Sequence, residues 1–157
     1  MPLKKSWRER LADDKDLPRI ETVTPKMRQK WGTGRFVIPA PREVDALMRQ
    51  VRKGKLTTIN DIRAALAKKH RVNFGCPITT GIFATIAARA ASEDEAEGKK
   101  RVTPYWRTLR EKGFLSDKYP GGPLEQKRRL EAEGHTVITR GKRFAVENFE
   151  KRLAKLR

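Results

Sequence analysis

The sequence is poor in the residues that disulfides and metal sites need. It has one cysteine, Cys76, so no disulfide can form within the chain, and a lone thiol suits a reducing compartment such as the cytoplasm. Its two histidines, His70 and His135, do not combine with that cysteine in a zinc-ligand spacing, so we expect neither a metal nor another cofactor. No segment approaches the roughly 20 apolar residues of a membrane span, so we expect no membrane partner.

Acidic residues are also scarce relative to basic ones. The 157 residues include 19 Asp and Glu against 37 Lys and Arg, for a formal net charge of +18. Such a field attracts polyanions, and nucleic acid is the commonest of them, because each cation placed on a phosphate releases condensed counterions. The charge therefore favours a nucleic-acid partner, and a highly charged solubilising surface is the alternative.

Changes in composition divide the chain into three segments: a basic N-terminal arm (1–36), one domain (37–146) and a basic C-terminal helix (147–157). The arm shows no sustained apolar period, so we expect it to wrap the domain or to stay mobile. Its Trp7 and Trp31 can pin it to the core or stack on bases.

The domain shows mainly helical periodicity. We expect helices over 41–52, from an N-cap at Thr57 or Thr58 to about Lys69, over 77–91 and over 123–133. In the third of these, Ile82, Phe83, Ile86 and Ala90 form the expected buried face. The second and third helices, joined by a tight turn, match a helix-turn-helix. The polar stretch 92–101 reads as a loop, residues 135–146 as a small β-hairpin, and the tail as a helix that docks through Phe149, Leu153 and Leu156.

Residues 103–134 carry the most specific pattern in the chain. Pro104 and Arg107 are followed by a Tyr-x-Gly-Gly turn at 119–122, a helix, and the closing pair Glu133 and Gly134. This pattern resembles the active-site block of the alkylguanine-DNA alkyltransferases. The upstream segment GKLTTINDIRAAL is similar to that family's Gly-x-Val-Thr-Thr-Tyr-Gly-x-Ile-Ala segment, so the resemblance spans roughly residues 41–135.

The resemblance implies a small winged helix-turn-helix domain that sits in the DNA minor groove and rotates a modified guanine into a pocket. The fold expected for the chain is therefore mainly α, with a winged helix-turn-helix, a C-terminal β-hairpin and a basic N-terminal arm. The residues that the resemblance places around the base pocket are Tyr105, Trp106, Arg107, Tyr119, Gly121, Gly122 and Glu133.

The departures from the family pattern concern the chemistry. Tyr105 and Trp106 stand where the family has its nucleophilic cysteine and activating histidine. A phenol with an ordinary pKa of about 10 is a poor alkyl acceptor, and an indole nitrogen only donates. The family's intercalating arginine falls near Gly81 and its helical tyrosine at Ile59. We therefore expect a binding protein similar to the alkyltransferase-like proteins, in which the aromatics either stack on an extruded base or plug the abandoned pocket.

The expected DNA contacts lie on the helix-turn-helix. Thr79 and Thr80 open the third helix, where backbone N–H groups can bind phosphate, although ordinary capping is the alternative. Arg89, further along that helix, can reach phosphate or face solvent. The remaining candidates flank the motif and are Lys53, Lys55, Thr58, Arg63, Lys68, Lys69 and Arg71.

Two other functions stay open at this point. Cys76 precedes a helix N-terminus, where a thiolate is stabilised, so it is the candidate nucleophile of a residual alkyltransferase; a packed apolar role is the alternative. A general nucleic-acid or RNA-binding protein can reuse the domain for its charge. The leading expectation is a monomeric, non-catalytic, cytoplasmic protein, nucleoid-associated in a bacterium, that binds double-stranded DNA with alkylated guanine and recruits other repair proteins.

Overall fold

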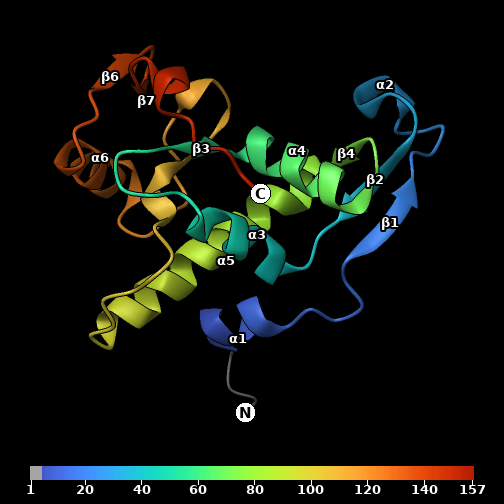
Figure 1. Cartoon of the computed structure of the whole chain (residues 1–157), viewed down its shortest axis with the longest axis horizontal. Helices are drawn as coiled ribbons and strands as arrows, with labels where there is room; N and C mark the ends of the chain where they lie inside the picture. Colours follow the sequence, from blue (N-terminus) through green and yellow to red (C-terminus); the bar gives the residue numbers. More distant parts are fainter. Residues whose placement is uncertain (1–4) are drawn as a thin grey trace.

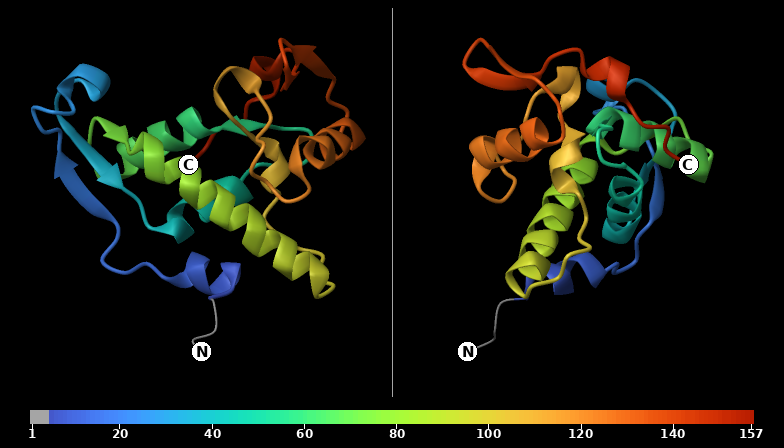
Figure 2. Two further views of the ribbon diagram at one scale, coloured as in Figure 1. Left: turned by 180° about the vertical axis from the view of Figure 1, so that it is seen from behind. Right: turned by 60° about the vertical axis from the view of Figure 1, so that its left-hand side comes forward.

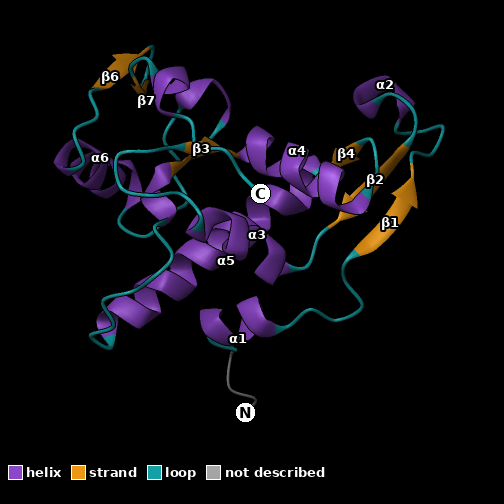
Figure 3. Ribbon diagram, in the orientation of Figure 1, coloured by secondary structure: helices purple, strands orange, loops and turns teal. Residues whose placement is uncertain are grey.

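The computed structural model describes residues 5–157. Its helices are α1 (Trp7–Ala12), α2 (Arg28–Trp31), α3 (Pro41–Arg49), α4 (Ile59–His70), α5 (Pro77–Ala96) and α6 (Gly122–Ala132), with 3-10 turns η1 (Tyr105–Arg107), η2 (Glu111–Gly113) and η3 (Phe149–Arg152). Its strands are β1 (Arg19–Thr22), β2 (Arg35–Ile38), β3 (Thr57–Thr58), β4 (Phe74–Gly75), β5 (Thr108–Leu109), β6 (Val137–Arg140) and β7 (Arg143–Val146). Helices predominate, but short sheets make the fold mixed α/β, so the mainly α expectation holds only roughly (Figure 3).

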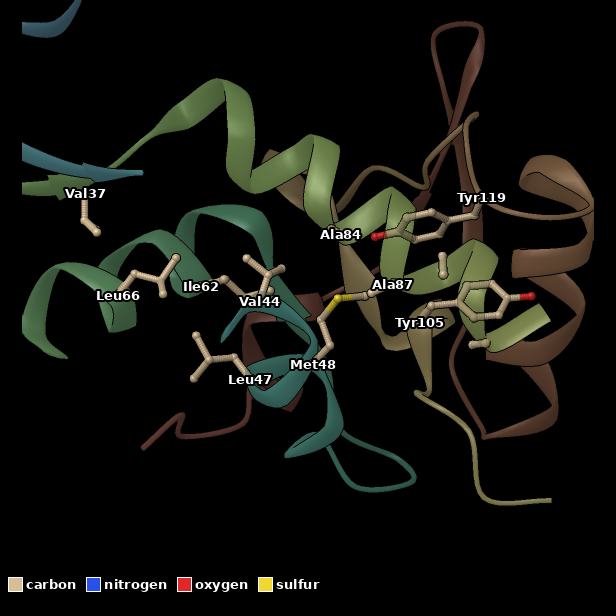
Figure 4. Packing of buried hydrophobic residues seen from close by; sticks show 12 residues of the cluster. Val37, Val44, Leu47, Met48, Ile62, Leu66, Ala84, Ala87, Tyr105 and Tyr119 are labelled. Carbon is tan, nitrogen blue, oxygen red and sulfur yellow. The ribbon is translucent and has the colours of Figure 1, made fainter. Parts of the chain in front are cut away.

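The helices α3, α4 and α5 pack together in the middle of the molecule (Figure 1). Pro41 at the first turn starts α3, and the Thr58 hydroxyl caps α4 by accepting from the Asp61 N–H at 3.1 Å. Their inward side chains meet in one cluster, in which Met48 of α3 and Ile62 of α4 are both fully buried (Figure 4). The starts of both helices agree with the sequence-based expectation.

The inward face of α5 agrees only in part with the predicted one: Ala90 is buried and Phe83 packs against the core, but Ile82 does not. This face consists mainly of small side chains, with Ala84, Ala87, Ala88 and Ala91 buried against α3 and α4. Ile82, which the sequence placed in the core, is 50% exposed. Because alanines fill the contact, α5 lies close to its neighbours, and Ile78 and Ile82 project outward.

Helix α5 also runs to Ala96, so the first half of the predicted loop 92–101 is helical. The polar residues there are held by partners far away in the sequence. The Glu93 carboxylate accepts from the backbone N–H groups of Trp7 at 3.1 Å and Arg8 at 2.9 Å, and Glu95 pairs with Arg129 at 3.0 Å. These contacts stabilise a last helical part that has no apolar period of its own.

The N-terminal arm, described from residue 5, folds onto the domain. Helix α1 packs on α5, and β1 pairs antiparallel with β2, which pairs parallel with β4 (Figures 1 and 2). Trp31 contacts Phe74 of the domain edge-to-face at 6.0 Å, and Arg89 of α5 lies over the Trp7 ring at 5.3 Å. Both tryptophans therefore pin the arm to the domain.

The C-terminal part contains the expected β6–β7 hairpin, but the tail is not the expected α-helix. It forms only the turn η3, after Asn148 in a left-handed conformation (φ 55°), and then becomes extended. Leu153 forms a parallel bridge with Leu56, and Phe149 packs in the same apolar cluster. Pairing with Leu56, and not a helical ladder, satisfies backbone groups of the tail: the Leu56 N–H donates to the Arg152 carbonyl and its carbonyl accepts from the Ala154 N–H.

Candidate nucleic-acid interface

The predicted helix-turn-helix pair is present as α4 and α5. Helix α4 ends at His70, the following residue Arg71 adopts a left-handed conformation (φ 56°), and a short turn with β4 leads to Pro77. Cys76 caps α5: its Sγ accepts from the Thr79 N–H at 3.5 Å, and its carbonyl accepts from the Thr80 hydroxyl at 2.6 Å. The start of α5 is therefore rigidly built.

A groove of about 390 Å³ lies between α4, α5 and the loop that follows β5. Ile78 and Ile82 are 60% and 50% exposed and make its α5 side apolar. Next to them Gly81 leaves open space where a Cβ would be. The residues that line the groove are Ile59, Asn60, Arg63, Pro77, Ile78, Gly81, Ile82, Thr85, Arg110, Glu111, Ser116, Lys118 and Tyr119.

Of the predicted base-pocket residues, only Tyr119 borders this groove. Tyr105 is 1% exposed and packs in the core, where its ring stands edge-on to Tyr119 at 5.5 Å (Figure 4). The Tyr105 ring also stands edge-on to Trp106 at 5.3 Å. Burial raises the pKa of both phenols, and the Tyr119 hydroxyl donates to the Thr108 carbonyl at 3.2 Å. The Tyr105 ring thus packs against both of the other rings.

The side chains of Trp106 and Arg107, in η1, form one hydrogen-bonded group with Glu133 at the C-terminal end of α6. The Trp106 indole donates to Glu133 at 3.0 Å, and Arg107 donates to both Glu133 carboxylate oxygens and to the Val51 carbonyl at 2.7 Å. Burial favours a raised pKa for Glu133, but the hydrogen bonds from Arg107 and Trp106 outweigh it and lower the pKa. Glu133 thus orients an indole, in the place where the family sequence pattern has a histidine.

Gly121 and Gly122 lie at the start of α6, outside the groove lining. Both have positive φ, 78° and 74°, and a Cβ on Gly121 would come within 2.6 Å of Glu125 Cβ. The Gly122 N–H donates to the Tyr119 carbonyl at 2.9 Å. The Tyr-x-Gly-Gly turn therefore fixes the backbone that carries Tyr119, since only glycine takes this conformation freely.

The predicted DNA-contact residues are spread over several surfaces. Arg63 lines the groove, and its Nε donates to the Gly75 carbonyl at 2.8 Å. Thr58 is the buried N-cap of α4, Thr80 is buried inside α5, and the Thr79 hydroxyl is buried. Arg89 donates to the Lys118 carbonyl at 2.9 Å. The other predicted cations are exposed outside the groove lining, and they are Lys53, Lys55, Lys68, Lys69 and Arg71.

Sequence reasoning missed the groove's loop cations, Arg110 and Lys118, and its two exposed isoleucines. A signal for Ile78 and Ile82 was present: α5 places alanines at positions 84, 87, 88 and 91, which leaves the bulky apolar residues on another face. Arg110 and Lys118 sit in an irregular loop, so no periodicity could have placed them beside α5.

Cys76 is not among the residues that line the groove, although its chain neighbour Pro77 is. Cys76 is 4% exposed and packs in a small apolar cluster with Val23 and Phe36, beside the arm.

Within residues 5–157, no group of three or more His, Cys, Asp and Glu side chains could hold a metal ion. In the same residues no helix is both long and apolar enough to cross a membrane.

The fold is similar to that of two solved structures of alkyltransferase-like proteins. One is S. pombe Atl1 in complex with damaged DNA containing O6-carboxymethylguanine, with a TM-score of 0.52 and 17% identity. Another is S. pombe ATL in complex with DNA, with a TM-score of 0.53 and 21% identity. Each likeness covers 73% of this chain and 94% of the other. No protein-family model and no curated protein matches the chain. The resemblance in the sequence is thus confirmed at the level of the fold.

Proposed function

We propose that this chain is a non-catalytic protein that binds double-stranded DNA and recognises alkylated or distorted sites for repair, with α4 and α5 acting as a winged helix-turn-helix. The groove carries this proposal. It combines an apolar face on α5 with the cations Arg63, Arg110 and Lys118, and the described residues that line it include no cysteine. Such a surface can hold phosphates while an apolar side chain approaches the bases.

The loop chemistry supports binding without alkyl transfer. A transfer needs a thiolate or a comparably activated nucleophile beside the bound base. Tyr105 is a buried phenol whose pKa is raised by burial, and Trp106 uses its only donor on Glu133. Cys76 is packed against Val23 and Phe36, outside the groove lining. None of these groups is placed to accept an alkyl group from a base held in the groove.

The outward face of α5 supports contact with the duplex. Ile78 and Ile82 lie one turn apart on this face, on either side of the position where the family pattern has an intercalating arginine. Apolar side chains of this kind are inserted between base steps by several proteins that bind the minor groove. We infer that the isoleucines act as the wedge here, while Arg110 and Lys118 hold phosphates across the groove.

The proposal is tested by equilibrium binding at fixed salt. Duplexes with O6-methylguanine or O6-carboxymethylguanine should bind more tightly than the matched guanine duplex and than duplex RNA. Equal affinities for these four ligands would rule out the recognition of damaged DNA. Binding to none of them would rule out a nucleic-acid function. After incubation with the alkylated duplex, the intact mass of the protein should stay unchanged. A gain of one alkyl group on Cys76 would instead establish a residual alkyltransferase.

A pair of variants tests the surface. Ile78→Asp should weaken duplex binding strongly, because it places a carboxylate against the phosphates and removes the wedge. It should fold, since an acidic residue in the first turn of α5 suits the helix dipole. Leu124→Asp is the control: Leu124 is 69% exposed on α6 and the change in net charge is the same. Equal losses in the two variants would show that binding depends on overall charge and not on this face of α5.

A further inference from the structure

A second positive surface lies on the arm, outside the helix pair and the groove lining. From residue 22 to residue 42 the sequence has no Asp or Glu. The exposed cations of this stretch include Lys26, Arg28, Lys30 and Arg35. Within residues 5–157, none of these four takes part in an ion pair. Their charges are therefore available to a polyanion.

An aromatic cluster fixes this stretch next to the start of α5. Trp31, at the end of α2, contacts Phe36 of β2 at 5.2 Å and Phe74 of β4 at 6.0 Å, and the two phenylalanines stack at 5.4 Å. Strand β2 pairs parallel with β4, and the Cys76 N–H donates to the Val37 carbonyl at 2.8 Å. The cations of α2 thus sit on a scaffold that continues directly into the N-cap of α5.

The same scaffold contacts the groove wall through Arg63 of α4. Arg63 lines the groove, its guanidinium lies over the Phe74 ring at 5.9 Å, and its Nε donates to the Gly75 carbonyl. In Figure 1 and in the left view of Figure 2, α2 lies to one side of α4 and the start of α5, and the loop over 110–118 lies to the other. The cations of the arm and those of the loop therefore flank the helix pair.

We propose that residues 24–35 form a second phosphate-binding element, which extends the duplex footprint beyond the helix pair. This inference rests on the proposed DNA-binding function. A duplex presents phosphates continuously along its length, so a protein that places α5 on it brings a flanking element to the neighbouring backbone. In this proposal the contacts of Lys26, Arg28 and Lys30 are to phosphates and not to base edges. These residues therefore contribute to affinity and to the register of the protein on the duplex, and not to the choice of lesion.

The test compares two triple variants with the same net charge. Lys26→Gln/Arg28→Gln/Lys30→Gln (the α2 variant) removes the exposed cations of α2 and of the turn before it, and Lys99→Gln/Lys100→Gln/Arg101→Gln removes three exposed cations just after the far end of α5 (Figure 1). Binding of an unmodified labelled duplex is measured over a range of KCl concentrations. Each lost phosphate contact should make the slope of log Kobs against log salt about 0.9 less negative, so the α2 variant should change it by about 2 to 3. The control should leave the slope near the wild-type value.

The outcomes separate the two proposals. A wild-type protein that does not bind duplex DNA defeats the DNA-binding function itself. A wild-type protein that binds, with an α2 variant whose slope equals that of the control, defeats only the second element. Lys30→Gln alone, which should shift the slope by about 0.9, keeps the test open if the triple variant fails to fold. An α2 variant that loses affinity for poly-glutamate but not for the duplex would assign these cations to an acidic protein partner and overturn the inference.

Discussion

Replacement of Arg107 by methionine should strongly destabilise the protein. The Arg107 and Glu133 side chains are only 14% and 8% exposed, and Arg107 also donates to the Val51 carbonyl. Arg107→Met keeps much of the stem volume but leaves a buried carboxylate with the Trp106 indole as its remaining side-chain donor. Removal of one partner of a buried pair costs about 3–5 kcal/mol, a large part of the roughly 5–15 kcal/mol that stabilises a domain.

Urea unfolding measures this effect. With a slope of roughly 2 kcal/mol per molar urea, the midpoint should fall by about 2 M. Glu133→Gln in the Arg107→Met background removes the stranded charge, so the double variant should cost less than the sum of the single variants by about 0.5–3 kcal/mol. Arg128→Met is the control: Arg128 pairs with Glu125 but is 67% exposed, so it should cost less than about 1 kcal/mol. Equal costs for Arg107→Met and Arg128→Met, or strict additivity in the double variant, would refute the reasoning.

Two further predictions concern the same part of the fold. Tyr105→Ala should lower the free energy of unfolding by about 3–5 kcal/mol in urea melts, because it empties a site that is 1% exposed; a cost below about 1 kcal/mol would contradict the core placement of Tyr105. Hydrogen bonds from Arg128 and Arg129 lower the pKa of Glu125 from 4.5 to about 2. Because this pKa is depressed on folding, the stabilisation is complete above pH 4.5 and is lost as the pH falls through about 2. The stability difference between wild type and Glu125→Gln should therefore shrink over that window, and a constant difference would argue against the paired carboxylate.

Local signals allowed parts of the fold to be predicted from the sequence. Pro41 and Thr58 mark the starts of α3 and α4 because a helix N-terminus depends on its own first residues. The far end of α5 could not be predicted in this way. Glu93 is held there by backbone N–H groups of the arm, and the tail is extended because Leu153 pairs with Leu56. Both outcomes depend on residues distant in the sequence.

The site was predicted to a similar extent. The block over 103–134 located the loop, and the helix pair was recognised from its spacing. The side-chain direction of Tyr105 could not be inferred, because it is set by packing of η1 on α5 and by the edge-on contact with Tyr119. The prediction that Ile82 is buried was wrong, because four alanines form the inward face of α5 and no larger residue is needed there. Periodicity indicates that a helix has apolar residues facing the core, but it does not identify them when alanines and isoleucines compete for that position. In α5 the smaller residues face the core.

The contacts of Arg89 make one tryptophan a built-in optical probe. Its guanidinium lies over the Trp7 indole, and its Nη2 holds the Lys118 carbonyl at the rim of the groove. A molecule that shifts Lys118 must loosen Arg89, and the environment of the Trp7 ring then changes. Emission of a protein that keeps Trp7 as its sole tryptophan would therefore report occupancy in real time, without any label attached to the nucleic acid.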